Sequence, residues 1–375
     1  MKKRFVFILV ILFIINISYT QQKTEWKGSI EVINGVTVVN NPREPMYKED
    51  VFSLKEELII GKTKGSEDFI FSEVRDLDVD TEERIFILDY KEANIKVFDK
   101  SGEHINTIGR KGQGPGEFQR PSQIYLTPQN EILVNDSGAR QIHFFSSDGT
   151  FKRSVSHTNM TFFGDPKVDQ KGQIVANYMI IDKKVTYVLK KFDSRLKEVM
   201  KIFSTDILKF PNLNPFFPKA SWEITHEGNV IWGFPEKYEL RIINSEGILI
   251  KIIIKDYNPI KITQEDKDSL IKKQFGGYDK VSPGVKIVWD DYYNAYRNFT
   301  IDDEDRIFVR TYEKILNGNG FYYDVFDSEG KYMAKIPLKI NLNRNSVWKN
   351  NKLYTIEEDE DGYQYVKRYK VSWNY

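Results

Sequence analysis

Short apolar stretches alternate with polar turns along most of this chain, and the alternation recurs at a nearly constant spacing. The clearest mark is a five-residue signature that ends in glycine and reads FDKSG at 98–102, FSSDG at 145–149, INSEG at 243–247 and FDSEG at 326–330. A degenerate copy, FDSRL, begins at Phe192, so the first three copies start 47 residues apart. A fixed period of this size is typical of stacked supersecondary units.

Each period predicts four short strands separated by polar turns. In the first copy we expect strands at 75–79, 84–88, 95–98 and 104–108, and in the second at 123–126, 131–135, 141–145 and 151–155. The second strand of the unit can be aligned six times, beginning at Ile85, Ile132, Ile174, Val230, Ile307 and Leu353. Four antiparallel strands in under about 50 residues form a propeller blade. The sequence therefore predicts an all-β, six-bladed β-propeller with four-stranded antiparallel blades.

The ends of the repeat predict how the ring closes. The last copy ends after its third strand, near 365–371, whereas an unmatched strand at 54–60 precedes the first full copy. We expect this N-terminal strand to complete the last blade, because closure removes an open sheet edge. Residues 29–39, with Asn34-Gly35 at the centre, predict a β-hairpin outside the ring.

One segment between the fourth and fifth blades breaks the repeat. Residues 256–291 predict a helix that Thr263 and Asp266 cap and that Gly276 ends. The expected organisation is a hairpin extension at 21–50 and a propeller at 51–375, with a helical insertion at 256–296. The insertion carries an aromatic cluster of Trp289, Tyr292, Tyr293 and Tyr296, and either a lid over one mouth or a packing brace would explain it.

Residues 1–20 have a basic start followed by an apolar run, which predicts a secretory signal peptide. An uncleaved membrane anchor is the alternative. We expect an exported protein, in the periplasm or on the cell surface, with no transmembrane span in the mature chain. The sequence contains no cysteine, which excludes a lipid-modified N-terminal cysteine and disulfides.

Composition and motifs narrow the chemistry. The chain has 55 basic and 54 acidic side chains, so its charge gives no reason to expect a nucleic acid partner. The glycine-rich run 109–116 lacks the strand, helix and lysine that a phosphate loop requires. The four histidines do not share a position in the repeat, and we expect neither a metal ion nor another cofactor.

Three sequences in the first two repeats carry a family resemblance: GQGPGEFQRP at 112–121, ILVND at 132–136 and FSSDG at 145–149. Together they resemble six-bladed propellers of the NHL-repeat type, and more closely the exported propeller proteins of Bacteroidetes. The resemblance implies a fold and an export route. It implies no particular activity, because propellers serve as enzymes, receptors and scaffolds.

Alignment of the repeats places polar and aromatic residues at the strand ends that border the channel mouths. Side chains there can contact a ligand directly. The candidate site residues are the cations Arg75, Arg297 and Arg310, the carboxylates Asp89, Asp136 and Glu357, the amides Asn135 and Asn177, and the aromatic residues Tyr178 and Phe234. As an alternative, Asp89 and Asp136 cap tight turns, and the arginines form structural ion pairs.

Three hypotheses about function follow. The first is an exported, non-catalytic propeller that binds a polar ligand, a glycan or a peptide, or an envelope protein at one mouth. The second is a lyase or hydrolase that uses Asp89, Asp136 or Glu357 around a divalent metal, so catalysis stays an open question. The third is a structural envelope protein whose mouth is filled by side chains.

Overall fold

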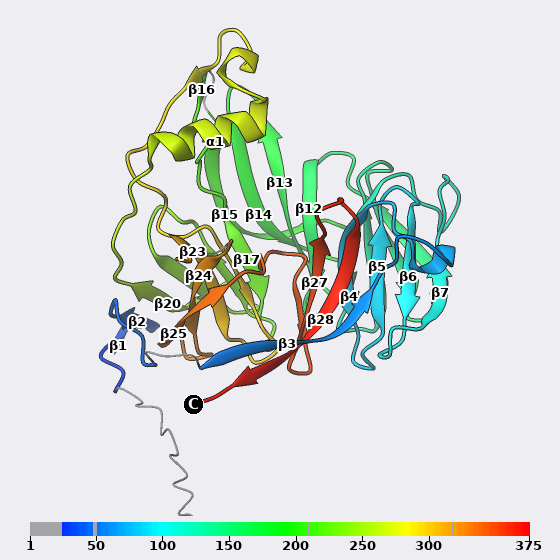
Figure 1. The fold of residues 1–375 in the computed structure, drawn as a ribbon, viewed down its shortest axis with the longest axis horizontal. Helices are drawn as coiled ribbons and strands as arrows, with labels where there is room; N and C mark the ends of the chain where they lie inside the picture. The colour runs from blue at the N-terminus through cyan, green and yellow to red at the C-terminus, as the bar shows by residue number, and fades with distance from the viewer. Residues whose placement is uncertain (1–24, 48–50, 209–210, 317–318) are drawn as a thin grey trace, which may run out of the picture.

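The computed structural model describes residues 25–47, 51–208, 211–316 and 319–375, and it confirms a ring of six four-stranded antiparallel sheets (Figure 1). We number the sheets as blades 1 to 6 in the chain order of their innermost strands. Blade 1 contains β4 (Val74–Val79), β5 (Ile85–Asp89), β6 (Asn94–Phe98) and β7 (His104–Ile108). Blade 2 contains β8 (Pro121–Leu126), β9 (Glu131–Asp136), β10 (Gln141–Ser146) and β11 (Phe151–Ser156). Blade 3 contains β12 (Thr161–Val168), β13 (Ile174–Ile181), β14 (Val185–Phe192) and β15 (Glu198–Leu208).

The second half of the ring follows the same plan. Blade 4 contains β17 (Ser221–Ile224), β18 (Val230–Gly233), β19 (Glu239–Ile243) and β20 (Leu249–Lys255). Blade 5 contains β22 (Asn298–Ile301), β23 (Ile307–Lys314), β24 (Phe321–Phe326) and β25 (Tyr332–Leu338). Blade 6 contains β26 (Val347–Lys349), β27 (Lys352–Glu358), β28 (Gln364–Trp373) and β3 (Phe52–Ile60).

The ring closes as the sequence predicts. The N-terminal strand β3 pairs antiparallel with β28, from Val366 opposite Ile60 to Trp373 opposite Phe52. Pairing the first propeller strand with the last one leaves no unmatched strand at the junction.

Six apolar clusters hold the blades together, and each one is shared by two neighbouring blades. Phe86 of blade 1 and Val134 of blade 2 belong to one cluster, for example, and Tyr354 of blade 6 and Ile87 of blade 1 belong to another. A single blade cannot cover both of its faces, so the neighbouring blades supply the core. The folded unit is therefore the whole ring.

The signature turn has a simple physical basis. Its glycine adopts a left-handed conformation, with φ of 87° at Gly102 and 91° at Gly149, and its N–H closes the turn between the third and fourth strands. Glycine has no Cβ, so this conformation is easily reached. In the degenerate copy Leu196 takes the same conformation, with φ of 61°. The turn therefore survives there without glycine.

The N-terminal hairpin is present and is attached to the ring. It consists of β1 (Ser29–Ile33) and β2 (Val36–Asn41), joined through Asn34 and Gly35, which both have positive φ. β2 pairs parallel with β20, so that the hairpin extends blade 4 to six strands. The alternating pattern predicted the hairpin, but not this attachment.

The predicted helical insertion contains α1 (Gln264–Phe275) and a short 3-10 helix, η2 (Tyr278–Lys280). Thr263 and Asp266 form the expected capping box, and Gly276 ends α1 with φ of 83°. A two-stranded parallel ladder, β16 (Asn212–Leu213) with β21 (Lys286–Ile287), ties the insertion to the loop between blades 3 and 4. A second 3-10 helix, η1 (Glu67–Phe69), precedes blade 1.

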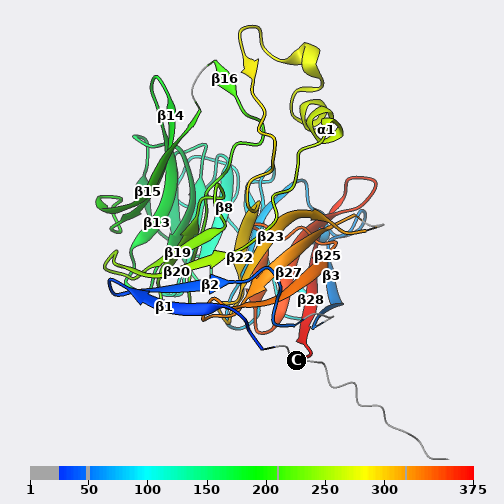
Figure 2. The same cartoon turned by 90° about the vertical axis from the view of Figure 1, so that its left-hand side faces the viewer.

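The insertion defines one side of the ring, which we call the upper face. This face carries the connections between blades and the turns between the second and third strands of each blade. Both views show α1 and β16 standing away from the ring on this side (Figures 1 and 2). Within the described residues, no helix has the length and apolar character needed to cross a membrane. The leader predicted at 1–20 lies outside the described residues.

Candidate functional site

Most of the ten predicted site residues lie at the upper ends of strands, because the second strand of each blade runs toward this face, whereas Asn177, Tyr178 and Arg310 lie within the longer strands β13 and β23. They are spread over all six blades. The structure divides them into those that face a shared polar surface and those that hold single turns.

A polar network crosses the upper end of the central channel. The carboxylate of Asp165 in blade 3 accepts hydrogen bonds from Gln123 of blade 2 and, at 3.2 Å, from the amide of Asn177. Asn135 donates to Gln123 at 2.9 Å. The guanidinium of Arg344, which precedes the innermost strand of blade 6, donates to Asp165 at 2.7 Å. Arg344 thus reaches the blade on the opposite side of the ring, and this ion pair spans the channel entrance.

Two further carboxylates face the channel below this network. Asp76 accepts a hydrogen bond from the N–H of Ile124, and Asp78 accepts one from the N–H of Leu126. These N–H groups belong to the innermost strand of blade 2, whose inner edge has no neighbouring strand. Burial raises the pKa of Asp76 to about 7 and that of Asp78 to about 6.

The channel cavity that these carboxylates line measures about 190 Å³. It is small for an organic ligand, since ligand pockets usually exceed about 300 Å³. The site residues predicted from the sequence do not include Asp76, Gln123, Asp165 or Arg344. All four share one position in the repeat, nine residues before the start of the second strand and one residue after the position of Arg75. A shift of the column by one residue would have found them.

Asp89 and Asp136 hold turns. Asp89 is fully buried and accepts hydrogen bonds from four backbone N–H groups, including those of Ser72 and Lys91. Asp136 does the same at the equivalent position of blade 2, with Gln119 and Gly138 among its donors. These contacts are the ones that the turn-capping alternative requires.

Three other predicted residues have local partners. Arg75 lies 2.6 Å from Glu73 and stacks on the ring of Tyr90. Tyr178 packs beneath the ammonium group of Lys190. Glu357 accepts hydrogen bonds from Thr355 and Tyr369 in its own blade. Arg75 shares Glu73 with Asp89, whose carboxylate accepts a hydrogen bond from the Glu73 N–H. Among the described residues Glu357 shares no hydrogen-bond or ion-pair partner with Asp89 or Asp136, so these three carboxylates stay apart.

Arg297 and Arg310 lie side by side at the upper end of blade 5. The N–H of Arg297 donates to the carbonyl oxygen of Arg310 at 2.8 Å, which places the two residues on adjacent strands. Arg310 is 6% exposed, and its guanidinium lies 4.1 Å from the ring centre of Phe321 and donates to the side-chain oxygen of Asn341. Burial lowers the pKa of Arg310, and the positive charge of Arg297 adds to this effect.

A row of half-buried aromatic side chains extends from blade 3 to blade 5 on the upper face. We call it the aromatic strip. One set of ring contacts includes Phe203 and Phe234 at 5.5 Å and ends at Phe217. The next residue in the sequence, Phe216, starts a second set, which ends at a stacked pair, Tyr293 and Tyr312, whose ring centres lie 4.3 Å apart. The strip comprises Tyr187, Phe203, Trp232, Phe234, Phe217, Phe216, Trp289, Tyr293 and Tyr312. Of the predicted site residues it includes Phe234, and of the predicted insertion cluster it includes Trp289 and Tyr293.

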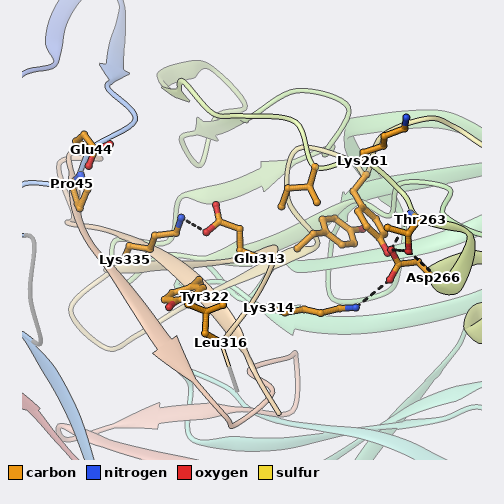
Figure 3. Close-up of a pocket in the computed structure, with 13 residues that line it drawn as sticks. Glu44, Pro45, Lys261, Thr263, Asp266, Glu313, Lys314, Leu316, Tyr322 and Lys335 are labelled. Atoms are coloured by element: carbon orange, nitrogen blue, oxygen red, sulfur yellow. Dashed lines mark hydrogen bonds and ion pairs between the residues drawn. The ribbon is translucent and has the colours of Figure 1, made fainter. Parts of the chain in front are cut away.

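The strip ends in a cleft of about 890 Å³ between the insertion and blade 5 (Figure 3), which we call the side cleft. Tyr293 and Tyr312 belong to both, so the strip and the side cleft form one continuous surface. The remaining lining mixes both signs of charge with a few apolar side chains: Glu44, Pro45, Ile260, Lys261, Thr263, Asp266, Glu313, Lys314, Leu316, Tyr322 and Lys335.

Two ion pairs inside the side cleft fix its walls. Asp266 at the start of α1 lies 3.2 Å from Lys314 of β23, and Glu313 pairs with Lys335 of β25. The first pair joins the insertion to blade 5. The insertion therefore acts as a brace for blade 5 and as one wall of the side cleft.

No three histidine, aspartate or glutamate side chains within the described ranges are placed to hold a metal ion. In the glycine-rich run, the carboxylate of Glu117 accepts hydrogen bonds from the N–H groups of Gln113 and Gly114. These two donors are therefore already occupied within the loop itself.

Comparisons with known proteins agree with this architecture. Residues 49–202 match a family model, DUF5128, that is described as a 6-bladed beta-propeller. A presumed exported protein from Bacteroides fragilis NCTC 9343 superposes with a TM-score of 0.56 at 13% identity, over 90% of this chain and 100% of that one. A member of the DUF4221 family from Bacteroides vulgatus ATCC 8482 gives a TM-score of 0.56 at 14% identity, over 86% of this chain and 99% of that one. No curated protein matches the sequence significantly.

Proposed function

We propose that this six-bladed β-propeller is an exported, non-catalytic binding protein that holds a polar ligand on its upper face. The observation that carries the proposal is the continuity of the aromatic strip with the side cleft. The side cleft has the volume of an organic-ligand site, which typically lies between about 300 and 1,000 Å³. Of the three kinds of partner expected from the sequence, a glycan fits this surface better than a peptide or an envelope protein.

The chemistry of the lining supports a glycan. Aromatic rings offer apolar faces, and the sugar ring offers apolar C–H groups that can pack on them. Lysine, carboxylate and tyrosine hydroxyl groups around the side cleft can form hydrogen bonds with sugar hydroxyls. The exported location rests on the apolar leader predicted from the sequence, and the presumed export of the Bacteroides fragilis protein with the same fold supports it.

Binding of the purified mature chain to a glycan and peptide array tests the proposal. We expect selective binding to glycans, and a loss of about tenfold in affinity for Tyr293→Ala or Trp289→Ala, which corresponds to about 1.4 kcal/mol of stacking. Tyr363, which is 48% exposed on blade 6 and outside the strip, provides the control Tyr363→Ala. Equal losses for all three variants, or binding to peptides alone, would contradict a glycan site on the strip.

The alternative, a lyase or hydrolase that uses a divalent metal, is tested on the same sample. Metal analysis of the purified chain and product analysis of every bound glycan should show neither a stoichiometric metal nor a cleaved product. Cleavage that requires a divalent metal and is lost in Glu357→Gln would favour the enzyme.

A further inference from the structure

We infer that the ligand of the upper face carries an acidic group, as a uronic acid does, and that Arg310 and Arg297 bind its oxyanion. The choice of a glycan rests on the proposed function, whereas its acidic group is inferred from the two arginines.

The first observation is a contrast between two equally buried arginines. Arg306 and Arg310 are each 6% exposed and lie four residues apart, at opposite ends of the same blade. Arg306 at the lower end has two carboxylate partners, Asp302 at 2.6 Å and Glu304 at 2.8 Å. Arg310 has no carboxylate within ion-pair distance among the described residues, and its Nε–H is buried without a hydrogen-bond partner.

A buried cation without a counter-ion is costly, and it loses hydrogen bonds that water would have given it. The amide of Asn341 and the ring of Phe321 compensate this loss in part. A bound carboxylate would supply the missing negative charge and an acceptor for Nε–H. Arginine can hold such a group through two parallel hydrogen bonds.

The second observation concerns Arg297. Its side chain is exposed, and within the described part of the chain it has no ion pair, hydrogen bond or ring contact. Most other arginines of this nearly neutral protein have a carboxylate partner, among them Arg75, Arg84 and Arg344. The positive charge of Arg297 acts unfavourably on that of Arg310, and a bound anion would offset this repulsion.

The position of the pair connects it to the proposed site. Arg297 influences the pKa of both Tyr293 and Tyr312, and Arg310 influences that of Tyr312. The two cations are therefore within electrostatic reach of the point where the strip meets the side cleft. A saccharide seated there can present a carboxylate to them while its neutral residues occupy the strip.

The binding experiment compares trigalacturonate with its neutral methyl ester by calorimetry. We expect the acid to bind more tightly than the ester by about tenfold or more, since hydrogen bonds to charged groups contribute about 1.5–3 kcal/mol. Arg297→Gln should remove most of this difference in affinity. A higher salt concentration should weaken the binding of the acid more than the binding of the ester. Arg195, which is exposed in a turn at the lower end of blade 3, provides Arg195→Gln as a charge-matched control.

A second readout does not depend on the identity of the glycan. In protein labelled with ¹⁵N-arginine, titration with glucuronate should shift the Nε–H resonance assigned through Arg310→Gln, and titration with glucose should leave it unchanged. If Arg310→Gln does not fold, Arg297→Gln still tests the pair, because its side chain is exposed.

The outcomes separate the two proposals. Equal affinity for acid and ester, with no effect of Arg297→Gln, overturns the acidic ligand and leaves the glycan site intact. A glucuronate-dependent shift at Arg310 without any binding of oligosaccharides supports the anion site and rejects the glycan. No shift with any acid rejects the inference.

Discussion

The guanidinium of Arg344 lies 2.7 Å from the carboxylate of Asp165, although the two residues are 179 positions apart and belong to opposite blades. Both side chains line the small channel cavity, which measures about 190 Å³. The side cleft beside the entrance is much larger, at about 890 Å³, and lies in the range of organic-ligand sites.

We expect this ion pair to contribute little to stability. The two side chains are 51% and 29% exposed, and pairs of this kind contribute about 0.2–1 kcal/mol. Arg344→Ala should lower the free energy of unfolding by less than about 1 kcal/mol in a urea titration. A loss of several kcal/mol would show that the pair locks the ring across its centre.

The buried pair of Lys191 and Asp169 should behave in the opposite way. Its atoms lie 2.9 Å apart, and the two side chains are 0% and 2% exposed. Lys191→Met should cost about 3–5 kcal/mol because Asp169 is left buried without its partner. The double variant with Asp169→Asn should recover part of that loss, as a double-mutant cycle will measure. Additive losses would mean that the two residues act independently.

Asp76 should make stability depend on pH. The pKa of Asp76 is about 7 in the folded chain, compared with 3.8 for a solvated aspartate, as in the unfolded chain. Between about pH 4 and pH 7 the folded state therefore binds a proton that the unfolded state has released. The free energy of unfolding should therefore fall as the pH rises through this window. Asp76→Asn keeps an oxygen acceptor for the N–H of Ile124 and cannot ionise.

The difference in unfolding free energy between Asp76→Asn and the wild type should grow in favour of the variant from pH 4 to pH 7. Each unit of pKa difference corresponds to about 1.4 kcal/mol, so the total change should reach a few kcal/mol. Taking the difference cancels the titration of all other groups. A constant difference across this range would show that Asp76 titrates normally.

The closing strand provides a matched pair of positions. Ile60 is 1% exposed and lies in the apolar cluster between blades 6 and 1, whereas its neighbour Ile59 is 48% exposed. Ile60→Ala should cost about 2–5 kcal/mol, and Ile59→Ala should stay within about 0.5 kcal/mol. Thermal unfolding followed by circular dichroism measures both. Similar, small losses would mean that β3 contributes little to closure.

Much of the fold could be predicted because each blade is encoded locally. The signature turn needs a left-handed residue at its end, the strands need alternating apolar residues, and both signals recur through the chain. The capping residues Thr263 and Asp266 likewise predicted the start of α1. The attachment of the N-terminal hairpin to β20 could not be predicted, because a parallel pairing between distant segments leaves no local trace.

The candidate site was less accessible to prediction. The repeat columns identified the upper ends of the strands, and with them Arg297, Arg310 and Phe234. They could not tell that Asp89 and Asp136 hold turns, because a turn carboxylate and a ligand carboxylate look the same in sequence. The roles of all ten predicted residues in binding stay predictions.

The sequence by itself determined the blade, the number of blades, the closing strand and the position of the insertion, since these follow from short-range patterns of apolar, polar and turn residues. The tertiary structure alone decided which side chains meet across the ring and beside it. Arg344 and Asp165 occupy the same position in two repeats that are 179 residues apart, and only the closed ring brings the two side chains together. The same holds for the unpaired charge of Arg310, because a missing partner becomes visible only when every neighbour is in place.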